Sequence, residues 1–193
     1  TGILVTEAEF DAAFKALAPD VREAIEFAVT AIRNFHEEQL PEPMWLKETS
    51  PGAFAGDRWH PIPSVGLYVP RGKGSFPSVT MMTSVPAVVA GVPEIAIFTP
   101  PAADGTVDAG VLIAARLVGV KRVYKCGGAG AIAAAAYGTE TISKVAKIVG
   151  PGSPWVVAAK RLLSDVVDVG LPAGPSEALV FADGTVDGRI AGL

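Results

Sequence analysis

The segment KIVGPGSPWVVAAKR, residues 147–161, contains the residues whose types and spacing most directly suggest chemistry. A short apolar run enters the turn Gly150-Pro151-Gly152, and an amphipathic helix follows at once. A helix start offers unpaired backbone N–H groups and the positive end of the helix dipole, so it suits an anion such as a phosphate. Glycine and proline also form ordinary tight turns, and a plain connection therefore stays open as the alternative.

Two further turns of this kind, Pro70-Arg71-Gly72 and Gly127-Gly128, also follow apolar runs. If these runs are parallel strands, the three turns lie at one sheet edge, where open α/β sheets bind their ligands. This arrangement favours a nucleotide-like ligand. The chain has neither G-x-G-x-x-G nor G-x-x-x-x-G-K-[ST], so the sequence does not favour the common modes of dinucleotide binding or P-loop chemistry. Arg71 and Lys73 either meet a phosphate or are solvated loop charges.

Metal ligands and nucleophiles are few in this sequence. His36, His60 and one cysteine give no recognisable zinc spacing. Cys126 ends an apolar run, where a buried structural thiol is the first expectation. Ser176 follows a Gly-Pro turn, and its hydroxyl either caps a turn or contacts a substrate.

The overall composition narrows the classes of function. A net charge of -4, with no basic run, argues against a nucleic-acid surface. The apolar runs are shorter than a membrane span, and we expect no membrane partner. A single cysteine excludes an intramolecular disulfide and fits a reducing, cytoplasmic compartment. The chain begins with Thr1 rather than methionine, which suggests processing or a cut chain.

The first 64 residues show a different pattern of predicted secondary structure from the rest. Thr6 and Glu9 have the spacing of a capping box and predict the start of a helix. A second helix is predicted from Pro19, with apolar residues at helical spacing. Two extended pieces around Ser50-Pro51-Gly52 then predict a β-hairpin.

From residue 65 onward, apolar strand-like runs alternate with helical segments. This alternation predicts an α/β fold, a Rossmann-like parallel sheet with helices on both faces. The predicted strands are residues 65–70, 94–100, 122–128, 147–152 and 178–183, and the predicted helices are residues 76–92, 106–120, 129–138 and 153–168.

Six motifs occur in an order that resembles one known family. They are VGLYVPRG, VPAVVAGVPEIAIFTPP, KCGGAGAIAAAAYGTET, KIVGPG, AAKRLLSD and PAGPSEALVFAD. Together they closely resemble the histidinol dehydrogenase family, strongly over residues 65–183 and more loosely before them.

The resemblance implies a zinc-dependent, homodimeric enzyme that uses NAD to oxidise a primary alcohol, through an aldehyde, to a carboxylate. It also implies two Rossmann-like domains, the second inserted within the first. Residues 65–176 would then be the inserted NAD-binding domain. Residues 1–64 and 177–193 would belong to the first, incomplete domain.

The same resemblance assigns roles to individual residues. It places Tyr68, Pro70, Pro151, Gly152 and Ser153 beside NAD. Ser176, in the motif PAGPSE, matches a substrate-contacting position of the family.

Two positions depart from the usual family pattern. Gly130 stands where the family usually has glutamine, and Ser153 where it usually has asparagine, and both normally contact NAD. The loop PRGKGSFPS is also longer and more basic than usual, which is similar to paralogues that oxidise other alcohols, sulfopropanediol among them. The family's zinc ligands and catalytic His-Glu pair fall C-terminal to the position of Leu193.

We therefore expect the N-terminal part of a histidinol-dehydrogenase-like enzyme, with catalytic and zinc residues absent and no activity by itself. The alternative is a non-catalytic binding or interaction module that keeps the fold. An incomplete first domain would leave an open sheet edge and bare apolar surface, so a homodimer or larger oligomer is expected.

Overall fold

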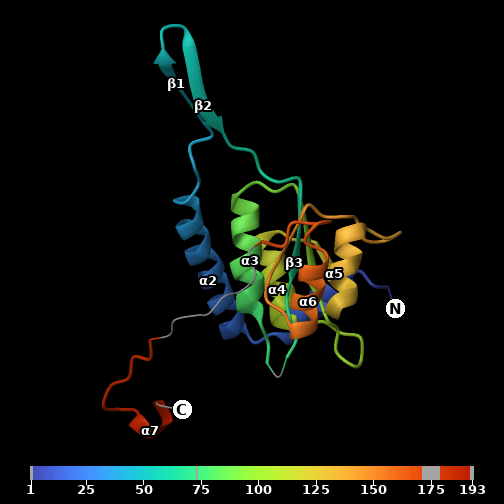
Figure 1. Ribbon diagram of the computed structural model, residues 1–193. Coiled ribbons are helices and arrows are strands. Elements are labelled where there is room, and N and C mark those ends of the chain that lie inside the picture. The colour runs from blue at the N-terminus through green and yellow to red at the C-terminus, as the bar shows by residue number, and fades with distance from the viewer. Residues whose placement is uncertain (1, 73, 171–178, 192–193) are drawn as a thin grey trace.

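The computed structural model describes residues 2–72, 74–170 and 179–191, and these contain a central four-stranded sheet with helices on both faces (Figure 1). The pairings between neighbouring strands are parallel, which confirms the predicted α/β class. The strands are β3 (Ser64–Tyr68), β4 (Glu94–Thr99), β5 (Arg122–Lys125) and β6 (Lys147–Val149), in the order β5-β4-β3-β6.

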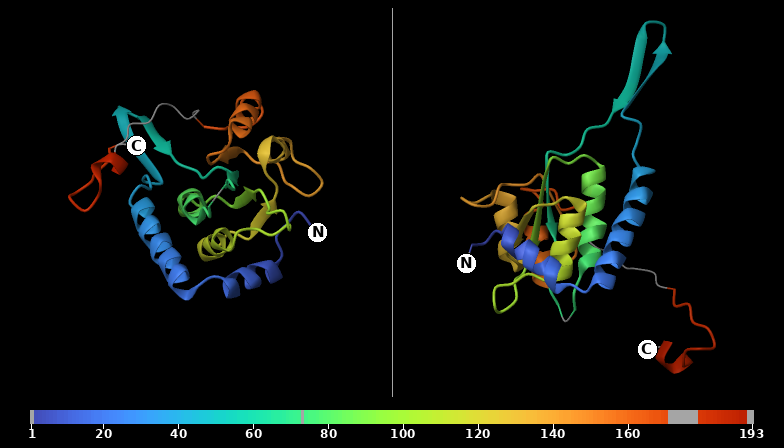
Figure 2. Two further views of the ribbon diagram at one scale, coloured as in Figure 1. Left: turned by 90° about the horizontal axis from the view of Figure 1, so that it is seen from below. Right: turned by 180° about the vertical axis from the view of Figure 1, so that it is seen from behind.

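The strands are apolar along nearly their whole length because both faces of the sheet are covered. Successive side chains point to opposite faces, so Ile97 packs with the cluster on one side and Phe98 with the cluster on the other. Figure 2 shows helices on both faces of the sheet. One face carries α3 (Pro77–Val89) and α4 (Ala109–Val118), and the other carries α5 (Gly128–Tyr137) and α6 (Pro154–Leu162).

Local signals in the sequence set several helix boundaries. Asp108 caps α4 by accepting a hydrogen bond from the Val111 amide at 3.0 Å. Gly119 ends the same helix with a φ of 96°, a conformation that L residues with side chains rarely adopt. Pro154 occupies the first position of α6, where its missing N–H costs nothing. No helix among the described residues is both long and apolar enough to cross a bilayer.

Two N-terminal helices, α1 (Glu7–Ala16) and α2 (Pro19–Glu37), pack outside α4 and α3. The predicted capping box at Thr6 and Glu9 is present. Residues before it pair with the outer edge of β5, where the Val5 amide donates to the Val123 carbonyl at 2.9 Å. The apolar face of the N-terminal helices thus shares one core with residues that follow residue 64. The predicted division into residues 1–64, 65–176 and 177–193 stays a prediction.

Lys125 and Glu9 form an ion pair that ties α1 to the end of β5. The distance from the Lys125 amine to the Glu9 carboxylate is 2.7 Å, and the Lys125 side chain is only 7% exposed. The hydrogen bond from Lys125, aided by those from Thr6, holds the pKa of Glu9 below its ordinary value. A buried ammonium group requires such a partner.

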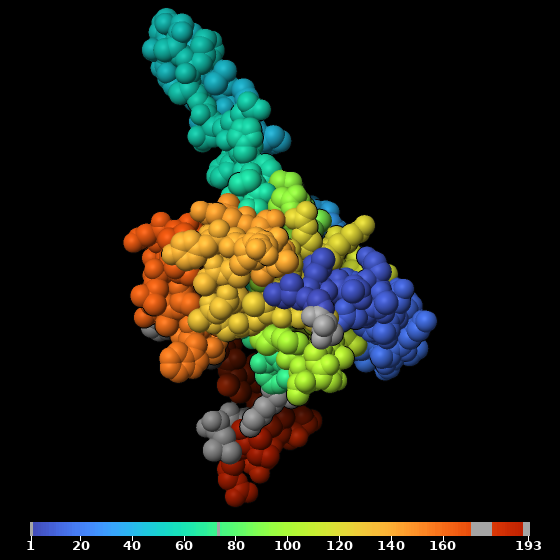
Figure 3. Space-filling view, turned by 90° about the vertical axis from the view of Figure 1, so that its right-hand side faces the viewer, coloured from blue at the N-terminus to red at the C-terminus, as the bar shows by residue number. Residues whose placement is uncertain are grey.

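A hairpin of β1 (Met44–Ser50) and β2 (Ala53–Arg58) confirms the predicted hairpin. Every residue of both strands is exposed. The hairpin stands clear of the body, as Figures 1 and 3 show. A two-stranded sheet that packs on nothing is at best marginally stable in water.

The strand predicted at residues 178–183 is wrong for the part that the structure describes. Residues 179–183 have no strand geometry, and the side chains of Leu179 and Phe181 are 92% and 93% exposed. A strand needs a hydrogen-bonding neighbour, and within the described ranges no strand lies beside these residues. The short helix α7 (Gly188–Ala191) follows them.

We expect Glu9→Gln to lower the free energy of unfolding at neutral pH by about 1.5–3 kcal/mol, the usual contribution of hydrogen bonds to charged groups. Glutamine keeps the shape and the capping-box oxygen but leaves the Lys125 ammonium without an anion. Since folding lowers the pKa of Glu9, its carboxylate stabilises the fold above the ordinary value of 4.5. That stabilisation disappears as the pH falls through the folded-state pKa.

Urea unfolding of both chains, at neutral pH and at the lowest pH that keeps them folded, measures this difference. The gap between variant and parent should close in acid. Glu7→Gln is the matched control, because Glu7 is 71% exposed in its 3.3 Å pair with Arg116 and should contribute less than about 1 kcal/mol. An acid-independent gap for Glu9→Gln would contradict the electrostatic explanation.

Candidate nucleotide-binding site

The glycine- and proline-rich turns lie together at the carboxyl edge of the parallel sheet. β3 is followed by Pro70, β5 by Gly127-Gly128 and β6 by Gly150-Pro151-Gly152. Because the strands are parallel, their carboxyl ends share one edge. The predicted gathering of the three turns is therefore confirmed.

The strand order predicts a ligand-binding crevice between two of these turns. From β3 the chain moves to β4 and then β5 on one side, and it later returns to place β6 on the other side of β3. The direction of winding thus reverses between β3 and β6. In open α/β sheets, ligands bind outside the carboxyl ends of the strands at this reversal.

Glycine is required at two positions of the β6 turn. Gly150 has a φ of 116°, and a β-carbon there would lie 2.1 Å from the Tyr68 carbonyl oxygen. A β-carbon on Gly152 would lie 2.4 Å from Cγ1 of Val156. The turn is therefore pressed against the backbone of β3 on one side and against α6 on the other.

The Tyr68 side chain lies beneath the turn rather than open to solvent. Its residue is only 3% exposed, and its hydroxyl oxygen accepts a hydrogen bond from the Gly128 amide at 2.9 Å. Tyr68 thus joins the end of β3 to the first turn of α5. Its backbone lies against Gly150 of the β6 turn, whereas its ring packs in the core with Phe98 and Ile148.

The other predicted site residues lie around the same edge. Pro70 is half-buried directly after β3, and Pro151 and Ser153 are exposed at the β6 turn. Ser153 is the N-cap of α6, but its side chain makes no capping hydrogen bond, so the amides of the first turn have no side-chain partner there. Gly130 is exposed on the first turn of α5, with open space where a β-carbon would lie. Ser176 and Lys73 lie outside the described residues.

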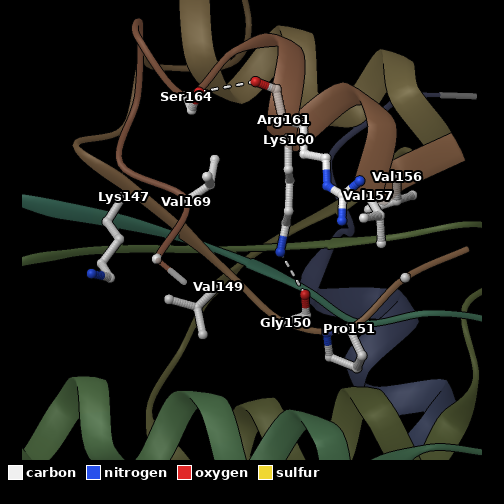
Figure 4. Close-up of a pocket in the computed structure, with 12 residues that line it drawn as sticks. Lys147, Val149, Gly150, Pro151, Val156, Val157, Lys160, Arg161, Ser164 and Val169 are labelled. Atoms are coloured by element: carbon white, nitrogen blue, oxygen red, sulfur yellow. Dashed lines mark hydrogen bonds between the residues drawn. The ribbon is translucent and has the colours of Figure 1, made fainter. Parts of the chain in front are cut away.

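A cavity of about 640 Å³ adjoins the β6 turn (Figure 4). Its walls are mainly apolar, and the Lys160 amine within it donates to the Gly150 carbonyl at 2.6 Å. Burial lowers the pKa of Lys160 from its ordinary value. Sequence reasoning missed this residue. The available signal was its position four residues after Val156, on the buried stripe of the helix.

The described residues around this edge do not favour thiol or metal chemistry. Desolvation raises the pKa of the half-buried Cys126 thiol, which keeps it protonated and poorly nucleophilic at neutral pH. Within the described ranges, no three His, Cys, Asp or Glu side chains lie together as a metal site would require. The geometry thus favours binding through backbone amides and loop walls over metal or thiol chemistry.

The chain is similar to known proteins over its whole length. The family model for histidinol dehydrogenase matches residues 1–192. A histidinol dehydrogenase homolog of Cereibacter sphaeroides is 72% identical over 192 residues, which is 100% of this chain and 44% of that protein. A histidinol dehydrogenase of Synechocystis sp. is 55% identical over 189 residues, 98% of this chain and 44% of that protein. The chain therefore spans less than half the length of these relatives.

The fold agrees with a solved structure of the same kind. The crystal structure of histidinol dehydrogenase from Elizabethkingia anophelis matches with a TM-score of 0.89 and 38% sequence identity, over 97% of this chain and 43% of that chain. Sequence and structure thus lead to one conclusion, that this chain belongs to the histidinol dehydrogenase family.

Proposed function

We propose that this chain is the NAD-holding part of a zinc-dependent oxidoreductase that oxidises a primary alcohol, through an aldehyde, to a carboxylate. The observation that carries the proposal is the reversal of the sheet's winding between β3 and β6, next to the Gly150-Pro151-Gly152 turn and the start of α6. Membership of the histidinol dehydrogenase family supports the reaction class. Oxidation of a different alcohol from histidinol is part of the proposal.

The residues at the crevice fit a dinucleotide. Because Gly150 and Gly152 have no side chain, the backbone of the turn lies close to Tyr68 and Val156. A bound phosphate likewise requires a backbone that it can approach closely. The first turn of α6 presents amides that the Ser153 side chain does not cap. Such amides and the helix dipole favour a phosphate. Pro70 and Pro151 would supply rigid apolar walls beside it.

In the proposed reaction, NAD would supply the hydride acceptor. The residues of this chain would bind the dinucleotide, orient it and exclude water from one side. Tyr68 would contribute indirectly, because its hydroxyl holds the Gly128 amide and so fixes the start of α5 beside the crevice.

The described residues do not fit a zinc ion. They offer no group of three metal-ligating side chains, and no step of the reaction is assigned to zinc through them. We therefore propose that the 193-residue chain by itself has no dehydrogenase activity. The proposed place of action is the cytoplasm, consistent with a single cysteine.

NAD should bind this chain weakly, with a dissociation constant near the millimolar range, and Gly130→Gln with Ser153→Asn should tighten it. Each added side-chain hydrogen bond contributes roughly 0.5–1.5 kcal/mol, so two give about tenfold to a hundredfold. The space at Gly130 accommodates the longer side chain.

Calorimetric titration of NAD into parent and double variant measures this change. Gly184→Gln is a matched control, since Gly184 also has open space at its β-carbon position but lies outside the crevice. Equal affinity of parent and double variant, or tight binding by the parent, would show that positions 130 and 153 do not face the cofactor.

We also propose that the chain forms a homodimer through its hairpin. Trp45 pairs with Asp57 and Phe54 with Glu48, so the two aromatic side chains lie on opposite faces of this two-stranded sheet, where they are 49% and 62% exposed. Their exposure, together with the marginal stability of an isolated hairpin, favours burial against a second copy.

The variant Trp45→Ser/Phe54→Ser removes the exposed aromatic side chain from both faces of the hairpin. It should raise the dimer dissociation constant by at least about tenfold, because one aromatic residue at an interface centre commonly contributes about 2 kcal/mol or more. Sedimentation velocity across the micromolar range measures the change. Phe27→Ser is the control, as Phe27 is 77% exposed on α2 rather than on the hairpin. A parent chain that sediments only as a monomer would refute the dimer.

A further inference from the structure

Lys160 reaches back from α6 to the turn at which that helix begins. Side chains on a helix tilt toward its N-terminus, and the Lys160 amine accordingly meets the Gly150 carbonyl at 2.6 Å. Figure 4 shows this bond joining the helix to the turn, among the residues that line the cavity. A hydrogen bond from an ionised donor is among the stronger kinds in proteins.

The surroundings of Lys160 make the Gly150 carbonyl its principal partner. Val149, Val157 and Val169 line the same cavity. Among the described residues, no carboxylate lies within ion-pair distance of the Lys160 amine, whereas the Lys147 amine pairs with Asp168 at 2.8 Å. A half-buried ammonium group among apolar side chains needs a hydrogen-bond acceptor. The position of the Lys160 amine therefore depends on the Gly150 carbonyl.

Gly150 is held on its other side by β3. The approach to the Tyr68 backbone leaves no room for a β-carbon, and its φ of 116° is open mainly to glycine. The Gly150 residue therefore lies between the β3 backbone and the Lys160 amine. The direction in which the amides of Gly152 and Ser153 leave the sheet depends on both contacts.

We propose that Lys160 is a positioning residue for the dinucleotide crevice, and this inference rests on the proposed function. Its bond to the Gly150 carbonyl selects the conformation of the turn in which the amides before α6 face the crevice. Without the bond the turn populates other conformations. The apparent affinity for NAD then falls in proportion to the fraction of molecules whose turn still has the binding-competent conformation.

The test compares Lys160→Met with Lys160→Arg in the full 193-residue chain. Methionine keeps the apolar stem and removes the donor, whereas arginine keeps both donor and charge. Amide chemical shifts and ¹⁵N order parameters of Gly152 and Ser153, recorded by NMR without ligand, report the turn itself. We expect Lys160→Met to shift both resonances, to lower their order parameters from about 0.85 toward the values below about 0.6 of flexible backbone, and to weaken NAD binding about threefold to tenfold.

Lys160→Arg should restore the order parameters of the parent and an affinity for NAD within about twofold of it. Arg161→Met is the matched charge control for the order-parameter measurement, since Arg161 lines the same cavity and has no hydrogen bond to Gly150 among those the structure records. It should leave the turn amides unchanged. A thermal melt of each variant confirms that it is folded.

The outcomes separate this inference from the proposed function. Unchanged shifts and order parameters of Gly152 and Ser153 in Lys160→Met overturn the positioning role. If NAD binding weakens while both stay unchanged, Lys160 contacts the ligand directly. An equal change in Arg161→Met would attribute the effect to charge alone and also overturn it. If the parent shows no shift changes with NAD, the proposed function fails, and the link from Lys160 to the nucleotide fails with it.

Discussion

At the carboxyl end of β3, the backbones of residues 68 and 150 approach so closely that a β-carbon on Gly150 would lie 2.1 Å from the Tyr68 carbonyl oxygen. This contact requires glycine, since any larger residue would force β6 away from β3. It fixes the separation of the two strand ends between which the winding of the sheet reverses. The proposed dinucleotide site lies at this reversal and depends on that separation.

Other contacts at this edge reinforce the same arrangement. The Tyr68 hydroxyl holds the Gly128 amide, and the place where a β-carbon on Gly127 would lie is only 2.3 Å from Cγ of Pro100. The ends of all four strands are therefore linked through backbone contacts and one buried phenol. Few of these contacts involve flexible side chains. The backbone amides at this edge are therefore already ordered before a ligand binds, and binding costs little conformational entropy there.

Two lysines show how a partly buried cation is used in this fold. Lys125 pairs with a carboxylate of α1 and so fastens the N-terminal helices to the sheet, whereas Lys160 meets the Gly150 carbonyl and fastens α6 to its own leading turn. In both cases an apolar environment makes the partner necessary. The first contact holds the N-terminal part on the core, and the second lies beside the proposed site.

The sequence by itself determined the local elements. A sheet covered on both faces requires apolar runs, which predicted β3 to β6, and the Thr6 capping box predicted the start of α1. Only the tertiary structure decided the order of the strands, and thus which two turns border the crevice, because pairing joins residues far apart in the chain. It also decided that residues 179–183 form no strand, since a strand needs a hydrogen-bonding neighbour. The spacing of Lys160 from Val156 places it on the buried stripe of α6, but only the tertiary structure showed that its amine meets the Gly150 carbonyl rather than extending to solvent.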